Sequence, residues 1–161
     1  MALTPESITD TALAVLSRFG MGDLSMRRLA RELDVQPSAL YWHVKNKQEL
    51  FALIARRFTG QVDARCPAAA HPAPAVVALA LREVLLGYRD GAEIHLLAYA
   101  LEPERAVPEA LAAALDERRL AATMGFVLGQ VAVEQSRTML GVDDPDAEDT
   151  FTHGLRALLA T

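Results

Sequence analysis

Hydrophobic residues recur every three or four positions along most of this chain. Ile8, Ala12 and Leu16 follow this spacing, and Leu50 and Ile54 repeat it further on. A repeat close to 3.6 residues is typical of an α-helix with one buried face, whereas a β-strand needs apolar and polar residues to alternate. No segment shows that alternation. We therefore predict an all-α fold.

Glycine, proline and capping residues divide this pattern into separate helices. The first four are expected from Pro5 to Phe19, after Ser25, from Pro37, and after Asn46. Residues 59–74 hold three prolines and are predicted to be a linker. Further helices are predicted at about 74–88, 91–101, 108–121, 122–140 and 150–160. The expected domains are a DNA-binding domain at 1–46, a connecting helix and linker at 47–74, and a ligand-binding and dimerisation domain at 75–161.

Charge is distributed unevenly between the two ends of the chain. The net charge is −5, but residues 1–60 hold eight Lys or Arg against six Asp or Glu. Residues 61–161 hold eight against fifteen. Within residues 25–47 five basic residues face two acidic ones, a local excess of +3. This asymmetry indicates a basic surface on an acidic body, as expected of a nucleic-acid binder.

Several classes of protein are excluded by composition. The longest apolar runs, 75–81 and 120–128, are too short to cross a membrane, and no basic and apolar leader opens the chain. We expect a cytoplasmic protein without a membrane partner. The single cysteine, Cys66, provides neither an internal disulfide nor a zinc ligand set. No nucleophile–base pair, metal set or phosphate-binding loop is present, so we predict no enzyme activity, no metal and no required cofactor.

The segment "SALYWHVKNK", residues 38–47, places Tyr41, Trp42 and His43 side by side just before the only two lysines. Adjacent residues on a helix point about 100° apart, so the three rings cannot all face one core. Two short helices joined by a tight turn, with exposed rings on the second, match a helix-turn-helix that enters the DNA major groove. Two alternatives remain: the rings pack a small bundle, or the chain is a helical protein-interaction module.

The helix-turn-helix interpretation assigns a role to each exposed residue of this region. The leading end of the third helix faces base edges, apolar residues there meet thymine methyl groups, and basic or aromatic residues around it contact phosphate. The candidate DNA-binding residues are Ser25, Arg27, Arg28, Gln36, Pro37, Ser38, Ala39, Tyr41, Trp42, His43 and Lys47.

Two segments carry a resemblance to a known family. Residues 24–50, "LSMRRLARELDVQPSALYWHVKNKQEL", resemble the DNA-binding motif of the tetracycline-repressor (TetR) family, and "RDGAEIHL" at 89–96 resembles its ligand-binding core. The resemblance implies a ligand-responsive transcriptional repressor that binds a palindromic operator in double-stranded DNA as a homodimer. A small-molecule inducer would release it. An activator without inducer-controlled repression is the alternative. Pro37 stands where the repressor that names the family has a base-reading glutamine, so we expect a different operator.

The resemblance also suggests positions for the ligand. His95 matches a histidine that binds the drug-borne magnesium in that repressor. The remaining candidate ligand residues differ in type from those of the drug site: Asp63, Val77, Leu81 and Tyr99. Since polar groups decide which ligand a pocket accepts, we do not expect tetracycline itself. The unknown effector is predicted to be more apolar, with aromatic or polyketide-like character.

Small and apolar residues near the C-terminus suggest a contact between two copies of the chain. Gly125 and Gly129 lie about one helical turn apart with Val133 beyond them, and Phe151, Leu155 and Leu158 form a second stripe. These six residues are the candidate dimer interface.

The chain departs from the family pattern in two places. No turn signal separates Arg119 from Gly125, and the segment 141–150 is shorter than its family counterpart.

Overall fold

A computed structural model describes residues 3–160, and every regular element within that range is helical. The prediction of an all-α fold is confirmed. Short 3₁₀ turns at Met21–Asp23 (η1), Ala68–Ala70 (η2) and Pro103–Arg105 (η3) accompany the α-helices. The α-helices are α1 (Pro5–Phe19), α2 (Met26–Glu32), α3 (Pro37–Tyr41), α4 (Lys47–Arg65), α5 (Pro74–Leu86), α6 (Gly91–Leu101), α7 (Glu109–Ala114), α8 (Glu117–Met139) and α9 (Ala147–Leu159).

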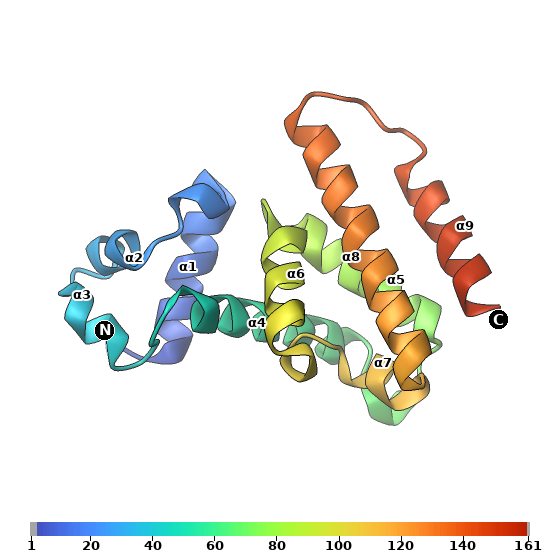
Figure 1. Cartoon of the computed structure of the whole chain (residues 1–161), viewed down its shortest axis with the longest axis horizontal. Helices are drawn as coiled ribbons and strands as arrows, with labels where there is room; N and C mark the ends of the chain where they lie inside the picture. The colour runs from blue at the N-terminus through green and yellow to red at the C-terminus, as the bar shows by residue number, and fades with distance from the viewer. Residues whose placement is uncertain (1–2, 161) are drawn as a thin grey trace.

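The helices form two groups joined by α4 (Figure 1). We call α1–α3, with the turns between them, the head, and α5–α9 the body. In Figure 1 the head lies at the left, α4 runs from it beneath the body, and α8 and α9 stand side by side at the right. Since α4 packs against α1 as well as against α5 and α6, the domain limits at residues 46 and 74 stay a proposal. None of the helices within residues 3–160 has the length and apolar character needed to cross a bilayer.

The fourth helix is longer than predicted. It continues to Arg65, so the linker expected from residue 59 consists only of the segment between α4 and α5. Phe58, Val62 and Cys66 are spaced four residues apart and all are buried, which carries the helical face past residue 58. Gly60 lies within α4 and does not end the helix.

The boundary between α7 and α8 also differs from the prediction. The sequence suggested a break between residues 121 and 122, but the chain is helical there and turns at Leu115 and Asp116. The Asp116 carboxylate accepts a hydrogen bond from the Arg119 N–H at 3.0 Å, which caps the start of α8. Leu115 is buried in an extended conformation and anchors the turn. The last helix begins at residue 147 instead of 150.

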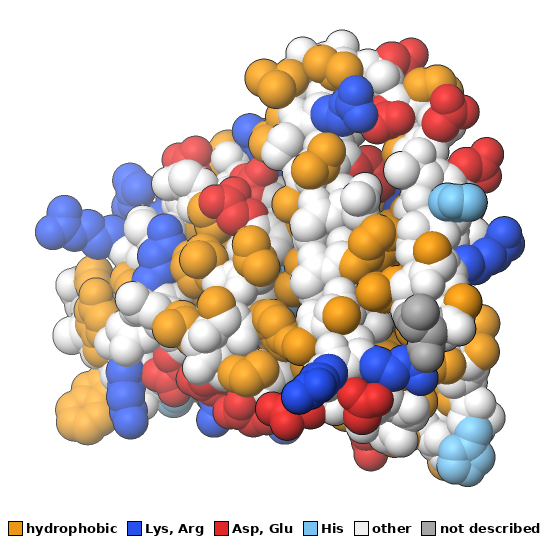
Figure 2. All heavy atoms as spheres, turned by 45° about the vertical axis from the view of Figure 1, so that its right-hand side comes forward, with side chains coloured by type: hydrophobic (Ala, Val, Ile, Leu, Met, Phe, Trp, Pro, Cys, Tyr) orange, Lys and Arg blue, Asp and Glu red, His pale blue; other side chains and the backbone are white. Residues whose placement is uncertain are grey.

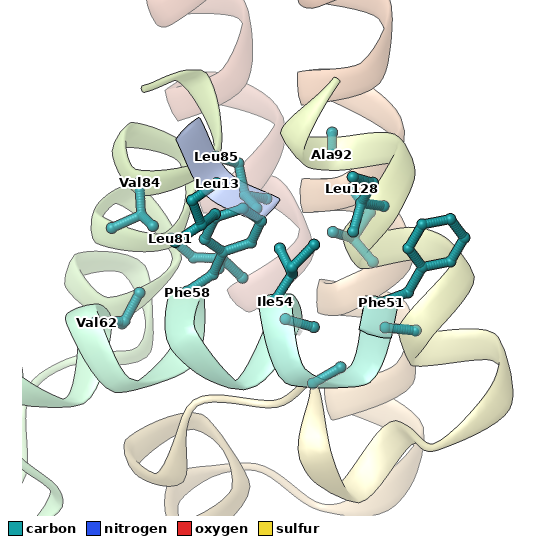
Figure 3. Close-up of a cluster of buried hydrophobic side chains, with 14 of the residues drawn as sticks. Leu13, Phe51, Ile54, Phe58, Val62, Leu81, Val84, Leu85, Ala92 and Leu128 are labelled. Atoms are coloured by element: carbon teal, nitrogen blue, oxygen red, sulfur yellow. The ribbon is translucent and has the colours of Figure 1, made fainter. Parts of the chain in front are cut away.

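The core is centred on α4. Figure 3 shows Ile54, Phe58 and Val62 pointing from α4 toward side chains of α5, including Leu81 and Leu85. Ile54, Phe58 and Leu81 are completely buried, and burying a side chain of this size contributes about 2 kcal/mol. This packing fixes α5 and α6 on the connecting helix.

The last helix is packed within the same chain. Phe151 and Leu155 are each only 1% exposed, and the rings of Phe126 and Phe151 lie 5.5 Å apart. A Cβ at Gly154 would come within 2.6 Å of the Phe126 ring, so glycine permits this close approach. Phe151 and Leu155 therefore belong to the core of one chain, which corrects their assignment to a contact with a second chain.

Candidate functional site

The turn between α2 and α3 is tight because of its local sequence. The Ser25 hydroxyl caps α2 by accepting the Arg28 N–H at 3.2 Å. Asp34 has a left-handed backbone with φ 52°, which aspartate tolerates, and the Val35 N–H returns to the Ala30 carbonyl at 3.0 Å. Pro37 then begins α3 at a position where no backbone N–H is needed. Two short helices are thus held at a sharp angle on the head.

The third helix divides its residues between the core and the surface. Leu40 and Val44 are fully buried, as predicted, whereas Tyr41 is 49% and Trp42 89% exposed. A fully buried aromatic side chain would contribute about 2 kcal/mol to folding stability, and the exposed Trp42 ring contributes almost none of this. This excludes the alternative in which Trp42 packs inside the head. The ring is therefore exposed to a binding partner.

The other predicted DNA-binding residues surround these rings. Most are exposed: Ser25, Arg27, Gln36, Pro37, Ser38, His43 and Lys47. Ala39 is half-buried. The Gln36 side chain makes no capping bond to α3 although it occupies the N-cap position.

Arg28 differs from these residues because its guanidinium already has partners. Its Nε lies 2.7 Å from the Glu32 carboxylate, and its Cζ lies 4.3 Å from the centre of the Phe19 ring. These contacts hold Arg28 against α1 and α2. Glu32 takes only the Nε donor, so the terminal NH2 groups of Arg28 could still donate to a phosphate.

The start of α4 places a cation beside α3. The Asn46 side chain accepts the Glu49 N–H at 2.8 Å, and the Glu49 carboxylate accepts the Lys45 N–H at 2.7 Å. This reciprocal cap fixes Lys47 in the first turn of α4, where its ammonium lies 5.4 Å from the Phe51 ring. Figure 2 shows Lys and Arg side chains projecting from the left edge of the molecule, where the head lies, while acidic side chains line the lower edge and the upper right.

A second candidate site lies in the body at His95, which is completely buried. Its Nε2 lies 2.7 Å from the Ala106 carbonyl oxygen, so Nε2 carries the proton and donates. Burial lowers the pKa of the imidazole to about 4, against the raising effect of this hydrogen bond, so the ring is neutral at pH 7. Nδ1 then holds a lone pair that has no hydrogen-bond partner among residues 3–160.

The predicted ligand residues do not line one open pocket. Val77 and Leu81 are fully buried in the core, as His95 is, and Tyr99 is half-buried. Asp63 lies elsewhere, in a surface cavity of about 390 Å³ that also involves Arg56, Arg105 and Val107. The five candidate ligand positions therefore do not lie together around this cavity.

Asp63 is itself engaged in a structural contact. Its carboxylate accepts the Glu109 N–H at the start of α7, at 2.9 Å. Partial burial raises the pKa of the Asp63 carboxyl, although this hydrogen bond acts in the opposite direction. Asp63 therefore connects α4 to α7 beside the cavity.

Three polar features of the body were missed by the sequence analysis. Thr123 on α8 is fully buried, and its hydroxyl has no hydrogen-bond partner within the described range. Arg82 forms a two-point ion pair with Glu134, at 2.8 and 3.2 Å, and Gln135 is bonded to the turn between α5 and α6. A polar residue on an apolar helix face is the only sequence signal for these features, and it does not reveal the partner.

The head has the geometry of a helix-turn-helix protein that binds DNA, with a short helix presenting exposed rings and cations, attached to a helical body. Comparison with known proteins identifies the family. Residues 8–54 match the family model described as bacterial regulatory proteins, tetR family. The chain is 30% identical over 191 residues to the class D tetracycline repressor protein of Escherichia coli, covering 98% of this chain and 88% of that protein. The chain belongs to the TetR family.

Solved structures agree with this assignment over the whole chain. BioQ with its natural double-stranded DNA operator is 29% identical, with a TM-score of 0.76, covering 99% of this chain and 97% of that one. A TetR variant from Acinetobacter baumannii AYE in complex with minocycline is 27% identical, with a TM-score of 0.74, covering 99% and 96%. The chain is accordingly a regulator of transcription of the TetR family and not an enzyme.

The buried His95 predicts a specific dependence of stability on pH. Its pKa is about 4 in the folded chain and close to 6.5 when unfolded, so between these values only the unfolded state binds the proton. Stability contributed by His95 is present above pH 6.5 and falls by about 3 kcal/mol as the pH drops toward 4. Urea unfolding of wild type and His95→Gln at several pH values between 4 and 7.5 measures this. The wild-type decline should be steeper, whereas His71→Gln, at an exposed position, should leave the slope unchanged.

Proposed function

We propose that this regulator reads its operator with α3 and the residues on either side of it. The observation that carries this proposal is the 89% exposure of Trp42 beside a buried Leu40. A large ring on a short helix remains in water only at a free energy cost, which a partner surface would recover. The local excess of positive charge supports DNA as that partner.

The predicted DNA-binding residues fall into three groups by their position on the head. Gln36, Pro37, Ser38 and Ala39 lie at the N-terminal end of α3, which meets base edges when such a helix enters the major groove. Tyr41, Trp42, His43 and Lys47 follow along the chain and are assigned mainly to the sugar–phosphate backbone. Ser25 and Arg27 contact phosphate from the start of α2, whereas Arg28 orders α2 through Glu32 and Phe19.

Substitutions on this surface test the proposal without disturbing the core. Trp42→Ala should weaken binding to an operator selected from random double-stranded DNA by about tenfold or more, at an unchanged melting temperature. Lys47→Ala should weaken all sequences about equally and lower the slope of log affinity against log salt by about one. Titration at several salt concentrations measures both. A Trp42→Ala protein that unfolds more easily but keeps its affinity per folded molecule would overturn the assignment.

For the homodimer we propose a contact surface on α8. Gly125 and Gly129 are exposed, and a Cβ at either position would meet nothing within 4 Å in the single chain. Val133, on the same side of the helix, is 54% exposed. Glycines spaced one turn apart allow a second helix to approach closely. Leu158 on α9 is half-buried and remains a proposed member of this contact.

The proposed dimer surface on α8 can be tested by substituting a glycine within it and, as a control, a glycine outside it. Gly129→Leu should weaken the dimer at least tenfold, because the added side chain keeps the partner helix at a distance. Gly60→Leu serves as the control, since Gly60 on α4 is equally open but outside the proposed contact. Sedimentation at micromolar and nanomolar concentrations measures both variants. A Gly129→Leu protein that dimerises like wild type would move the interface elsewhere.

We further propose that the inducer binds between α6 and α8 at His95 and Thr123. These two residues supply the unpartnered buried atoms Nδ1 and Oγ1, and their helices pack against each other. A neutral imidazole with a free lone pair accepts a hydrogen bond, so the ligand carries a donor such as a phenol. The buried core of the body is apolar and includes Val77 and Leu81, which favours an aromatic, polyketide-like ligand.

Access to this site requires movement, because the core is closed around His95. The cavity beside Asp63 is lined by Arg105 and Val107, the chain neighbours of Ala106, whose carbonyl accepts the hydrogen bond from the His95 ring. An inducer entering there would displace the segment between α6 and α7. A ligand of this kind acts only through its higher affinity for the opened state. We place the regulator in the cytoplasm, where operator DNA and such ligands meet.

Two substitutions separate inducer binding from folding. Thr123→Val keeps the shape of the side chain and replaces an unpartnered hydroxyl with a methyl group, so stability should be maintained or increased. Release from the operator by aromatic polyketide probes should require at least tenfold more ligand in Thr123→Val and in His95→Ala, at unchanged operator affinity. Fluorescence anisotropy of labelled operator measures release. Equal release by wild type and both variants would place the inducer elsewhere.

A further inference from the structure

One side chain of α8 holds the turn between α5 and α6. The Gln135 Nε2 donates to the Leu85 carbonyl at 3.0 Å and to the Tyr88 carbonyl at 2.8 Å, and its Oε1 accepts the Ala92 N–H at 3.1 Å. A side-chain amide has two N–H donors, and here both are used together with the carbonyl. Gln135 therefore connects the end of α5 and the start of α6 to the same point on α8.

The turn that Gln135 holds has little freedom of its own. Asp90 has a left-handed backbone with φ 56°. A Cβ at Gly91 would come within 2.5 Å of the Leu85 carbonyl oxygen, so only glycine fits there. The turn consequently moves as a unit with α8 as long as the three hydrogen bonds to Gln135 persist.

The same turn contacts the head directly. The Asp90 carboxylate accepts the Met21 N–H at 2.7 Å, at the start of η1 between α1 and α2. Asp90 occupies the N-cap position of α6, but its side chain makes no capping hydrogen bond to that helix. The carboxylate binds the head instead. Gly20 lies against Asp90 and Arg89, where a Cβ would come within 2.7 Å of the carboxylate oxygen. The connection between α1 and α2 is thus seated on the α5–α6 turn.

We propose that Gln135 and Asp90 are positioning residues that set the orientation of the head relative to α8. The path runs from α8 through Gln135 to the turn, and from Asp90 to the Met21 N–H. It is separate from α4, which joins head and body through the chain itself. Because α8 also carries the proposed dimer surface, this path fixes the distance between the two heads of a dimer. The inference rests on the proposed dimer surface in this last step only.

The ion pair between the head and α4 is less able to fix the orientation of the head. Arg57 and Asp10 lie 2.6 Å apart, but their side chains are 37% and 62% exposed. Ion pairs in contact with water contribute little and are weakened by salt. The hydrogen bond between Asp90 and Met21 is partly buried and joins a side chain to the backbone, so it constrains direction as well as distance.

The test compares variants that remove the path with variants that retain it. Gln135→Ala removes the three bonds to the turn, and Asp90→Gly removes the carboxylate while allowing the left-handed backbone. Asp90→Asn keeps an oxygen that accepts the Met21 N–H and tolerates the same backbone conformation. Gln130→Ala removes an exposed amide from the same helix and is the control.

Two measurements report on the head itself. Spin labels at Ser38→Cys, in a Cys66→Ala background that removes the only other thiol, give the distance distribution between the two heads of the ligand-free dimer. Anisotropy titration gives affinity for the selected operator and for versions with one or two base pairs inserted between the half-sites. Sedimentation verifies that each variant is dimeric.

Gln135→Ala and Asp90→Gly should widen the distance distribution, weaken binding to the selected operator by about tenfold, and reduce the discrimination against altered spacing. Asp90→Asn and Gln130→Ala should resemble wild type in all three. The proposal is overturned if Gln135→Ala lowers the melting temperature but leaves the distance distribution and the spacing preference unchanged. Failure of the wild type to bind selected DNA would instead refute the proposed DNA interface, since the label distances need no operator.

Discussion

The packing of α4 is the constraint on which the rest of the structure depends. Leu50, Ile54, Phe58 and Val62 are all completely buried, and α4 contacts α1 in the head as well as α5 and α6 in the body. One helix therefore belongs to the cores of both parts. A change in how the body packs on α4 is transmitted to the head through rigid contacts, since close-packed side chains do not deform continuously.

The body combines this packing with polar groups that are incompletely satisfied. A buried imidazole with a pKa near 4, whose Nδ1 has no partner within the described residues, and an unpartnered hydroxyl at Thr123 both lower the stability of the closed core. A ligand that supplies the missing hydrogen bonds recovers this free energy only in an opened state. The same feature thus makes the closed core less stable and would give an inducer at the proposed site its differential affinity.

Regulation requires that such an opening reaches the DNA-binding surface. α6 begins at the turn that Gln135 and Asp90 hold, and it ends near the segment whose Ala106 carbonyl binds His95. A displacement at one end of this eleven-residue helix is transmitted to the other end, because α6 is a rigid element between its contact with Gln135 and the contact of His95 with Ala106. The head is therefore connected to the His95 region by α6 and by α4 together.

The sequence by itself determined the helical fold class and the helix-turn-helix of the head, since these depend on periodicity, capping residues and a local motif. Only the structure showed that Trp42 does not pack in the head. The sequence misplaced the end of α4, because the helix continues past Gly60 through the buried Val62. It also misplaced the break before α8, because the chain is helical at residues 121 and 122 and α8 is capped by Asp116. It also assigned Phe151 to a contact with a second chain, whereas the ring packs against Phe126; an apolar stripe suits both environments. Only the tertiary structure brought Met21 to Asp90 and Gln135 to the α5–α6 turn, because residues far apart in the chain meet through packing that no local pattern encodes.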